Sequence, residues 1–269
     1  MEYKIISTDF DGTLLTSDKR VSSKNKNTLL KYKNQGYIIV GITARNLPSV
    51  KSKVDIEIFD YVILNNGGYV YDVKKEDGYY VKIIDRETIT KIVKHFKDIC
   101  QGIDYISINK YYMFRNNGLL DHRHFVQEVE SFDEIFEPIC RMNIMANNMD
   151  DLESYKDYLD QNIKEIDSII MCDTDDKTCR KWIAINPKGF NKFTGLKELC
   201  EKLNVDSSQV IFFGDSANDI EIIKNVGLGV AMENALPEVK EIAKEVTLTN
   251  DDDGVAYFLE KVLMGWKIT

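Results

Sequence analysis

The segment "KIISTDFDGTLLTSD", residues 4–18, runs an apolar stretch into two carboxylates, Asp9 and Asp11, that one phenylalanine separates. Paired carboxylates can serve as oxygen ligands for magnesium, as a nucleophile and as a proton carrier. A carboxylate that attacks phosphorus forms an acyl phosphate, so a second carboxyl must protonate the leaving oxygen and later activate water. Gly12 permits a tight turn, and free amides in this loop can hold phosphoryl oxygens. The motif indicates phosphoryl-transfer chemistry.

Other interpretations of this motif stay open at this point. A D-x-D-G sequence also occurs in plain turns, in calcium loops and in nucleotide-sugar sites that hold manganese. An EF-hand loop requires glutamate at its twelfth position, where this chain has Arg20. The remaining choice depends on the elements that position the two carboxylates.

Strands alternate with helices in both terminal parts of the chain. Residues 3–8, 37–43 and 60–66 have strand patterns, and a helical pattern over 22–36 ends at Gly36, a typical C-terminal cap. The alternation returns near residue 189 and continues to the last helical pattern, 254–266. It predicts an α/β fold with a Rossmann-like parallel sheet.

Four polar motifs fall at the carboxyl ends of the predicted strands, where ligands bind in open parallel sheets. Asp9 and Asp11 follow the first strand, and Thr43 and Arg45 follow the second. The other two are Asn66 with Gly67, and "GDSANDI" at 214–220. Each alone could be a strand end, a turn or a helix cap. Together they predict one site.

The segment between the two alternating parts has its own strands and helices, so it predicts a separate domain. The expected domains are a discontinuous catalytic core, residues 1–81 and 187–269, and an inserted α+β cap, residues 82–186. The motif "DHRH" at 121–124 lies in this insert. A solvated helix start is its plainer interpretation, and His122 and Arg123 are the candidates for contact with a substrate.

The composition describes a soluble globular protein of 269 residues with a net charge of -9. This charge argues against nucleic acid as a partner, because such binding depends on basic surfaces. No stretch has the roughly 20 apolar residues that a membrane helix needs, and no signal peptide begins the chain. We therefore expect a cytoplasmic protein without a membrane partner, a monomer or a weak homodimer.

Six motifs in order give the chain a family resemblance: "DFDGTL" (9–14), "GITAR" (41–45), "NNGG" (65–68), "NPKGFNKFTGLKEL" (186–199), "GDSANDIEI" (214–222) and "GVAMENA" (229–235). In this order they resemble the haloacid dehalogenase superfamily, and in particular its Cof-like, class IIB phosphatases. The resemblance covers both core segments and implies a C2B-type cap. The insert matches only in position and size.

The resemblance implies a role for each matching residue. Asp9 would be the nucleophile and a magnesium ligand, and Asp11 the general acid and base, with its backbone carbonyl on the metal. Thr43 would bind a phosphoryl oxygen, and Lys192 would balance the phosphoryl charge. Asp215 and Asp219 would complete the metal site. The substrate-binding set implied around them is Gly12, Thr43, Ala44, Arg45, Asn66, Gly67, Lys192 and Asn218.

Two of these assignments have an alternative. The role given to Lys192 could belong to the nearby Lys188, because this chain has Phe193 at the position after Lys192 where the family motif has a glycine. Arg45 is expected to hold the ligand or a closed cap rather than to perform chemistry.

The predicted function is a magnesium-dependent phosphatase of small phosphorylated metabolites, such as sugar phosphates, that forms an aspartyl phosphate. One alternative is a phosphotransferase or phosphomutase on the same scaffold. Another is a non-catalytic sensor of a phosphorylated ligand. The presence of Asp11 beside Asp9 argues against a sensor, because Asp11 would activate water and shorten the life of an aspartyl phosphate.

Overall fold

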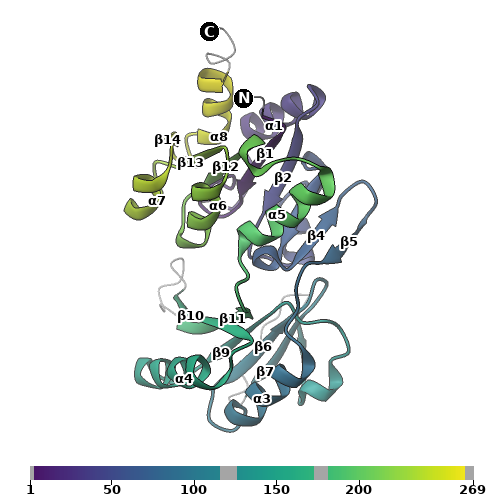
Figure 1. Ribbon diagram of the computed structural model, residues 1–269, viewed down its shortest axis with the longest axis vertical. Coiled ribbons are helices and arrows are strands. Elements are labelled where there is room, and N and C mark those ends of the chain that lie inside the picture. The colour runs from purple at the N-terminus through teal and green to yellow at the C-terminus, as the bar shows by residue number, and fades with distance from the viewer. Residues whose placement is uncertain (1–2, 116–125, 173–180, 264–269) are drawn as a thin grey trace. The chain divides into compact units, whose positions relative to one another are not determined.

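The computed structural model describes residues 3–115, 126–172 and 181–263, of which positions 172, 262 and 263 are described by their backbone. The chain divides into two compact units (Figure 1). The first, here called the core unit, comprises Met1–Arg45, Ser49–Val81 and Asn191–Thr269. The second, the insert unit, comprises Asn46–Pro48 and Lys82–Phe190.

The core unit is built on one eight-stranded sheet with the order β14-β13-β12-β1-β2-β3-β4-β5. The strands are β1 (Ile5–Asp9), β2 (Ile38–Ile42), β3 (Tyr61–Leu64), β4 (Tyr69–Asp72), β5 (Asp77–Tyr80), β12 (Val210–Gly214), β13 (Leu228–Ala231) and β14 (Glu245–Val246). From β14 to β3 all neighbours are parallel, whereas β3, β4 and β5 pair antiparallel. β1 is central and all five of its residues are buried, including the polar Ser7 and Thr8, as expected for a strand inside a parallel sheet.

Helices cover the sheet of the core unit. They are α1 (Ser23–Asn34), α5 (Lys192–Leu203), α6 (Ile220–Asn225), α7 (Pro237–Ile242) and α8 (Gly254–Tyr257), which continues as a π-helical turn, Phe258–Leu263. The short helix α2 (Leu47–Lys51) has its first two residues in the insert unit and the rest in the core unit. α5 and α6 lie in front of the sheet in Figure 1. α1 is tied to the C-terminal helix: Tyr32 Oη donates to the Leu259 carbonyl (2.5 Å), and Ala256 N donates to Asn25 Oδ1 (2.9 Å).

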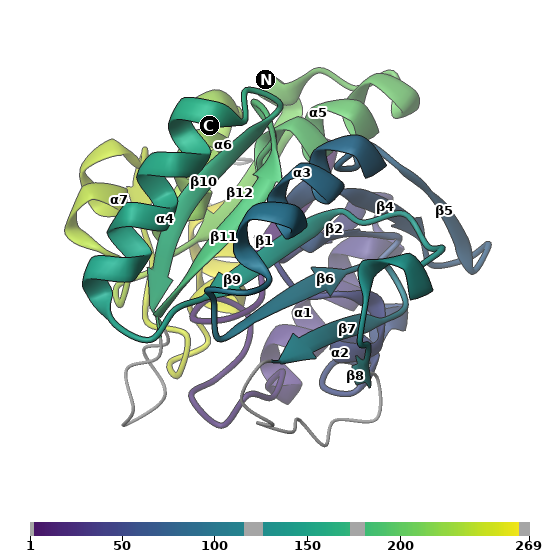
Figure 2. The same cartoon turned by 90° about the horizontal axis from the view of Figure 1, so that it is seen from below.

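The insert unit contains a six-stranded sheet with the order β10-β11-β9-β6-β7-β8. Its strands are β6 (Gly102–Ile106), β7 (Tyr111–Arg115), β8 (Val126–Glu128), β9 (Arg141–Met145), β10 (Ile166–Cys172) and β11 (Lys181–Pro187). Two amphipathic helices, α3 (Arg86–Phe96) and α4 (Met149–Asn162), cover one face of this sheet (Figure 2). The helices and the sheet share a hydrophobic core of their own, in which Phe96, Ile144 and Leu159 are fully buried. This mixture of strands and helices matches the α+β character predicted for the insert.

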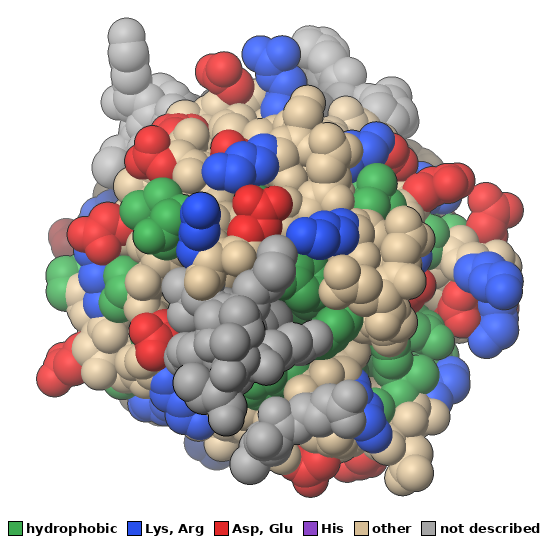
Figure 3. Space-filling view, turned by 90° about the horizontal axis from the view of Figure 1, so that it is seen from above, with side chains coloured by type: hydrophobic (Ala, Val, Ile, Leu, Met, Phe, Trp, Pro, Cys, Tyr) green, Lys and Arg blue, Asp and Glu red, His purple; other side chains and the backbone are tan. Residues whose placement is uncertain are grey.

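The fold class predicted from the sequence is confirmed, with two additions. The hairpin of β4 and β5 gives the sheet an antiparallel edge, and β14 adds a two-residue strand at the other edge. On the face shown in Figure 3, acidic and basic side chains are interspersed rather than grouped by sign. Among the described residues, no helix is both long enough and apolar enough to cross a membrane.

Candidate active site

Asp9 is the last residue of β1, and its side chain is buried at the carboxyl end of the sheet. The loop that follows turns through Gly12, whose φ of +77° lies in the left-handed region. A Cβ atom at Gly12 would lie 2.3 Å from Oδ2 of Asp215. Asn234 holds this turn through a 2.7 Å hydrogen bond from Nδ2 to the Gly12 carbonyl. The glycine therefore lets the loop after β1 approach the loop after β12.

The loop after β12 supplies two further carboxylates, Asp215 and Asp219. Asp219 is fully buried, and its Oδ2 accepts hydrogen bonds from the amides of Asp215 and Ser216, both at 3.1 Å. Oδ1 of Asp215 accepts a 2.8 Å hydrogen bond from Thr13 Oγ1. These bonds fix the direction in which both carboxylates point.

Lys192 is the first residue of α5 and only 1% exposed. Its Nζ lies 2.8 Å from Oδ1 of Asp9 and 2.8 Å from Oδ1 of Asp219. Asn191 caps this helix by accepting the amides of Phe193 and Thr194, so the start of α5 and the direction of Lys192 are set locally.

Lys188, the alternative to Lys192, lies elsewhere. It belongs to the insert unit, where its largely exposed ammonium pairs with Asp167. Only Lys192 of this pair contacts Asp9 among the described residues.

Asp9, Asp215 and Asp219 form a carboxylate cluster in which one oxygen of each lies within 4.8 Å of the others. Three carboxylates share one ammonium, so the ionised cluster has an excess of two negative charges. Burial, and then the repulsion from Asp219 and Asp215, raises the pKa of Asp9 well above its usual range, although Lys192 opposes this. Burial and Asp219 raise the pKa of Asp215 to about 6. This donor set of hard oxygen atoms with uncompensated charge fits a divalent cation such as Mg²⁺.

Lys192 responds to the same cluster in the opposite direction. Burial alone would lower the pKa of its ammonium, but Asp219 and Asp9 outweigh burial and raise it. Lys192 is therefore held in its charged form, as charge neutralisation of a bound anion requires.

Asp11 is not one of the three clustered carboxylates and forms an ion pair with Arg45. Nε and Nη2 of Arg45 each lie 2.7 Å from one carboxylate oxygen of Asp11, and Nζ of Lys19 lies 3.6 Å from Oδ1. Burial favours the neutral acid, but the hydrogen bonds and charge of Arg45 outweigh it and lower the pKa of Asp11. The two carboxylates of the opening motif thus have opposite electrostatic environments.

The remaining predicted residues of the core unit line the neighbouring strand ends. Thr43 is buried just after β2, and its carbonyl accepts the amide of Asn66 at 2.9 Å, with half-buried Ala44 beside it. Nδ2 of Asn218 donates to Oδ1 of Asn66 over 3.4 Å. Gly67 lies against α5, where a Cβ at Gly195 would come within 2.7 Å of its carbonyl oxygen. The loops after β2, β3 and β12 are therefore joined.

Two of the predicted site residues, His122 and Arg123, lie outside the described residues. Other residues contact the site although no role was predicted for them. Sequence reasoning gave no role to Thr13, Lys19 and Ser49, which contact Asp215, Asp11 and Arg45 respectively. Of these three contacts, only that between Thr13 and Asp215 joins residues far apart in sequence, 202 positions from one another. Thr13 lies inside the first motif and Asn234 inside the last, so motif membership was the available signal for those two.

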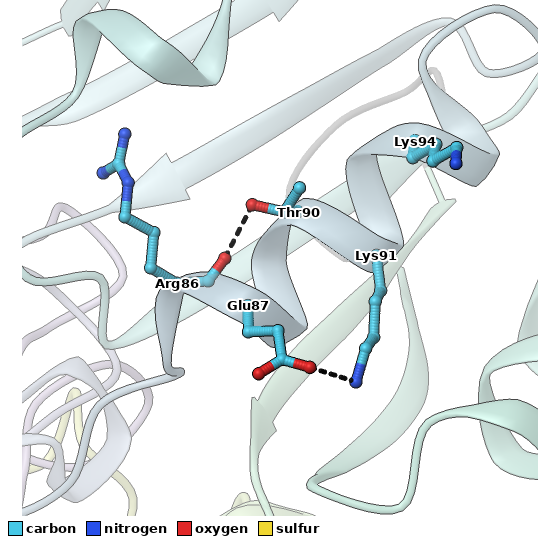
Figure 4. A pocket seen from close by; sticks show the side chains of 5 residues that line it. All are labelled: Arg86, Glu87, Thr90, Lys91 and Lys94. Atoms are coloured by element: carbon cyan, nitrogen blue, oxygen red, sulfur yellow. Dashed lines mark hydrogen bonds and ion pairs between the residues drawn. The ribbon is translucent and has the colours of Figure 1, made fainter.

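A separate surface hollow in the insert unit is lined by one face of α3: Arg86, Glu87, Thr90, Lys91 and Lys94 (Figure 4). Most of its polar groups already have partners within the insert unit, and Nη1 of Arg86 donates to the Ile135 carbonyl at 2.7 Å. Lys91 pairs with Glu87 at 2.9 Å, and Thr90 Oγ1 donates to the Arg86 carbonyl at 2.7 Å. The hollow has the chemistry of an ordinary helix surface.

The fold and this cluster define an α/β protein with a carboxylate site at the carboxyl ends of its parallel strands. The chain belongs to the haloacid dehalogenase-like hydrolase family, whose model matches residues 6–259. The resemblance read from the motifs, including the Cof-like class, is thereby confirmed, as is the prediction of an enzyme of the phosphatase type.

Three similar proteins illustrate the match. A Streptococcus pyogenes protein, provisionally named a phosphatase, is 30% identical over 276 residues, covering 97% of this chain and 98% of its own. A Bacillus subtilis 5-amino-6-(5-phospho-D-ribitylamino)uracil phosphatase is 27% identical, covering 96% of each chain. The crystal structure of a haloacid dehalogenase-like hydrolase from Bacteroides thetaiotaomicron has a TM-score of 0.80 at 25% identity, covering 97% of this chain and 100% of that one. The similarity therefore extends over both units.

Proposed function

We propose that this protein is a magnesium-dependent phosphatase of small phosphorylated metabolites that acts through an aspartyl phosphate on Asp9. The observation that carries the proposal is the buried contact of Lys192 with both Asp9 and Asp219, beside Asp215. A nucleophilic carboxylate, a fixed ammonium and a cluster suited to a divalent cation are the parts that phosphoryl transfer requires.

The proposed reaction has two balanced halves. A carboxylate oxygen of Asp9 attacks phosphorus, the bond from phosphorus to the leaving oxygen breaks, and that oxygen takes a proton from Asp11. This step uses the protonated form of Asp11, although Arg45 favours the ionised form. Water then attacks the same phosphorus, the bond to Asp9 breaks, and the water proton passes to Asp11. The net change is hydrolysis of a monoester to an alcohol and phosphate.

Asp9, Asp215 and Asp219, with the backbone carbonyl of Asp11, would hold Mg²⁺. When bound, this cation neutralises negative charge on the phosphoryl group and the nucleophile. Lys192 contributes a second positive charge from the protein itself, and Thr43 and the amides of the loop after β1 bind phosphoryl oxygens. Ala44, Asn66, Gly67 and Asn218 complete the proposed wall of the phosphoryl site.

For the substrate, we propose a sugar phosphate or a similar monoester. The Bacillus subtilis relative is named for a phosphorylated ribityl compound, which supports a polyhydroxylated leaving group without identifying it. We further propose that the insert, residues 82–186, is a cap that determines the leaving group, with His122 and Arg123 as candidate contacts. Arg123→Ala should then change the order of preferred metabolites while hydrolysis of p-nitrophenyl phosphate persists.

Phosphate release measured across a panel of metabolites with Mg²⁺, and expressed as kcat/KM, tests the proposal. The expected result is turnover with a clear preference among monoesters. Suppression of phosphate release by an added sugar acceptor would favour a phosphotransferase or mutase instead. A stable phosphorylated protein without turnover would favour a sensor. We also propose that the protein acts in the cytoplasm, as a monomer or a weak homodimer.

A further inference from the structure

We propose that Arg45 is a positioning residue for Asp11 and that it does not bind the phosphoryl group. The inference rests on the proposed function, because it assigns Asp11 to proton transfer. It starts from the two-point ion pair in which Nε and Nη2 of Arg45 each lie 2.7 Å from a different oxygen of Asp11.

The guanidinium of Arg45 is committed to protein partners at all three nitrogens. Two of them bind Asp11, and the third, Nη1, donates to Oγ of Ser49 at 3.0 Å. A planar guanidinium with this fork geometry fixes both the distance and the plane of a carboxylate, which a single ammonium cannot do. The Arg45 guanidinium therefore links the carboxylate of Asp11 to the hydroxyl of Ser49.

The backbone of Arg45 is fixed as well. Its amide donates to Oγ1 of Thr43 at 3.1 Å, and its carbonyl accepts the amide of Asn65 at 2.9 Å. Hydrogen bonds therefore hold Arg45 at both ends: its backbone just after β2 and its guanidinium at Ser49. Asp11 is held in one orientation before any substrate arrives.

Orientation of Asp11 matters because a proton must pass between its carboxyl and the reacting oxygen in each half of the reaction. Each carboxylate oxygen has two lone pairs, so the ion pair with Arg45 leaves acceptor sites on Asp11. Without Arg45 the side chain would sample other rotamers, and the fraction of time within reach of the leaving oxygen would fall.

Two types of substrate separate positioning from phosphoryl binding. An alkyl phosphate, such as glycerol phosphate, has a poor leaving group that needs protonation, whereas p-nitrophenolate leaves without a proton. In Arg45→Gln, kcat/KM should fall at least about tenfold more for glycerol phosphate than for p-nitrophenyl phosphate. The inhibition constant of inorganic phosphate should stay within about twofold of the wild-type value, because the phosphoryl site is untouched. Arg45→Lys, with one-point contact, should fall between Arg45→Gln and wild type.

Arg20→Gln is the matched control, since it removes the same charge from an exposed position of the core unit. It should leave kcat/KM for both substrates unchanged. Ser49→Ala removes the hydrogen bond that Nη1 of Arg45 donates. It should lower kcat/KM for glycerol phosphate more than for p-nitrophenyl phosphate, by a smaller factor than Arg45→Gln does, and it provides the test if Arg45→Gln does not fold. Equal losses on both substrates with weaker phosphate inhibition would overturn the proposal, as would full activity. A wild-type protein that hydrolyses neither ester would instead contradict the proposed function.

Discussion

Lys192 reaches Asp9 inside the protein: Nζ lies 2.8 Å from Oδ1, and the two side chains are only 1% and 7% exposed. A second contact of the same length ties Lys192 to Asp219, so one ammonium neutralises part of the charge of two buried carboxylates. Removal of one partner from such a buried group leaves uncompensated charge and costs more than the loss of a surface ion pair.

Lys192→Met should therefore lower both stability and turnover. The free energy of unfolding of the metal-free protein should fall by about 3 kcal/mol or more, because Asp9 and Asp219 lose their shared cation. Urea unfolding measures this change, and kcat with saturating Mg²⁺ measures the loss of charge at the phosphoryl site. Lys188→Met is the control, since that exposed lysine pairs with Asp167 in the insert unit. An equal effect of both substitutions would contradict the assignment of Lys192.

Gly12 and Gly36 provide a matched pair of backbone substitutions. Both have positive φ, +77° and +94°, but a Cβ at Gly12 would overlap Asp215 whereas Gly36 has open space around it. Gly36→Ala should cost about 1 to 2 kcal/mol of stability, the strain of a left-handed residue. Gly12→Ala should in addition reduce kcat about 10²-fold by displacing Asp215. Comparable activities of the two folded variants would show that the loop after β1 tolerates this displacement.

Metal removal should stop turnover and lower the melting temperature, because the ionised cluster has excess negative charge. Differential scanning fluorimetry after treatment with EDTA, and again after addition of Mg²⁺, measures the second effect. We expect Mg²⁺ to raise the melting temperature of the wild type and to raise that of Asp215→Asn much less, because the substitution removes one of the proposed ligands. Full activity in metal-free buffer would contradict the magnesium assignment.

The raised pKa of Asp215, about 6 against an ordinary value near 3.9, gives the metal-free protein a particular pH dependence. The folded protein holds this proton more tightly than the unfolded chain does. The stability from this difference is fully present below about pH 4 and is lost as pH rises through about 6, by at most about 3 kcal/mol. Urea unfolding in EDTA across this window should show the loss, and Asp215→Asn should reduce it. An unchanged slope in Asp215→Asn would assign the effect to other groups.

Much of the core unit follows from sequence because its signals are local. The apolar start of β1 and the helical pattern over 22–36 that ends at Gly36 predict two elements that the structure contains, β1 and α1. The hairpin of β4 (Tyr69–Asp72) and β5 (Asp77–Tyr80) was missed, since an alternation of strands and helices predicts parallel neighbours and has no place for a strand pair without a helix.

Positions in the candidate site were predictable to the extent that strand ends converge. That rule groups Asp9, Thr43 and Asp215 from the sequence alone. It could not give the orientation of a side chain, so the pairing of Asp11 with Arg45 and of Thr13 with Asp215 appears only in three dimensions. Contacts between residues far apart in sequence leave no local pattern.

Formation of an aspartyl phosphate on Asp9 is the central claim, and a quench during turnover tests it most directly. Wild-type protein is mixed with substrate and Mg²⁺, quenched in acid before substrate is exhausted, digested with protease and analysed by mass spectrometry. The account predicts one phosphoryl group on the peptide that contains Asp9, which hydroxylamine removes as it does other acyl phosphates. Asp9→Asn, folded as the wild type by circular dichroism, should show neither this phosphoryl group nor turnover. Normal magnesium-dependent turnover by Asp9→Asn, or a phosphoryl group on another residue, would contradict the account.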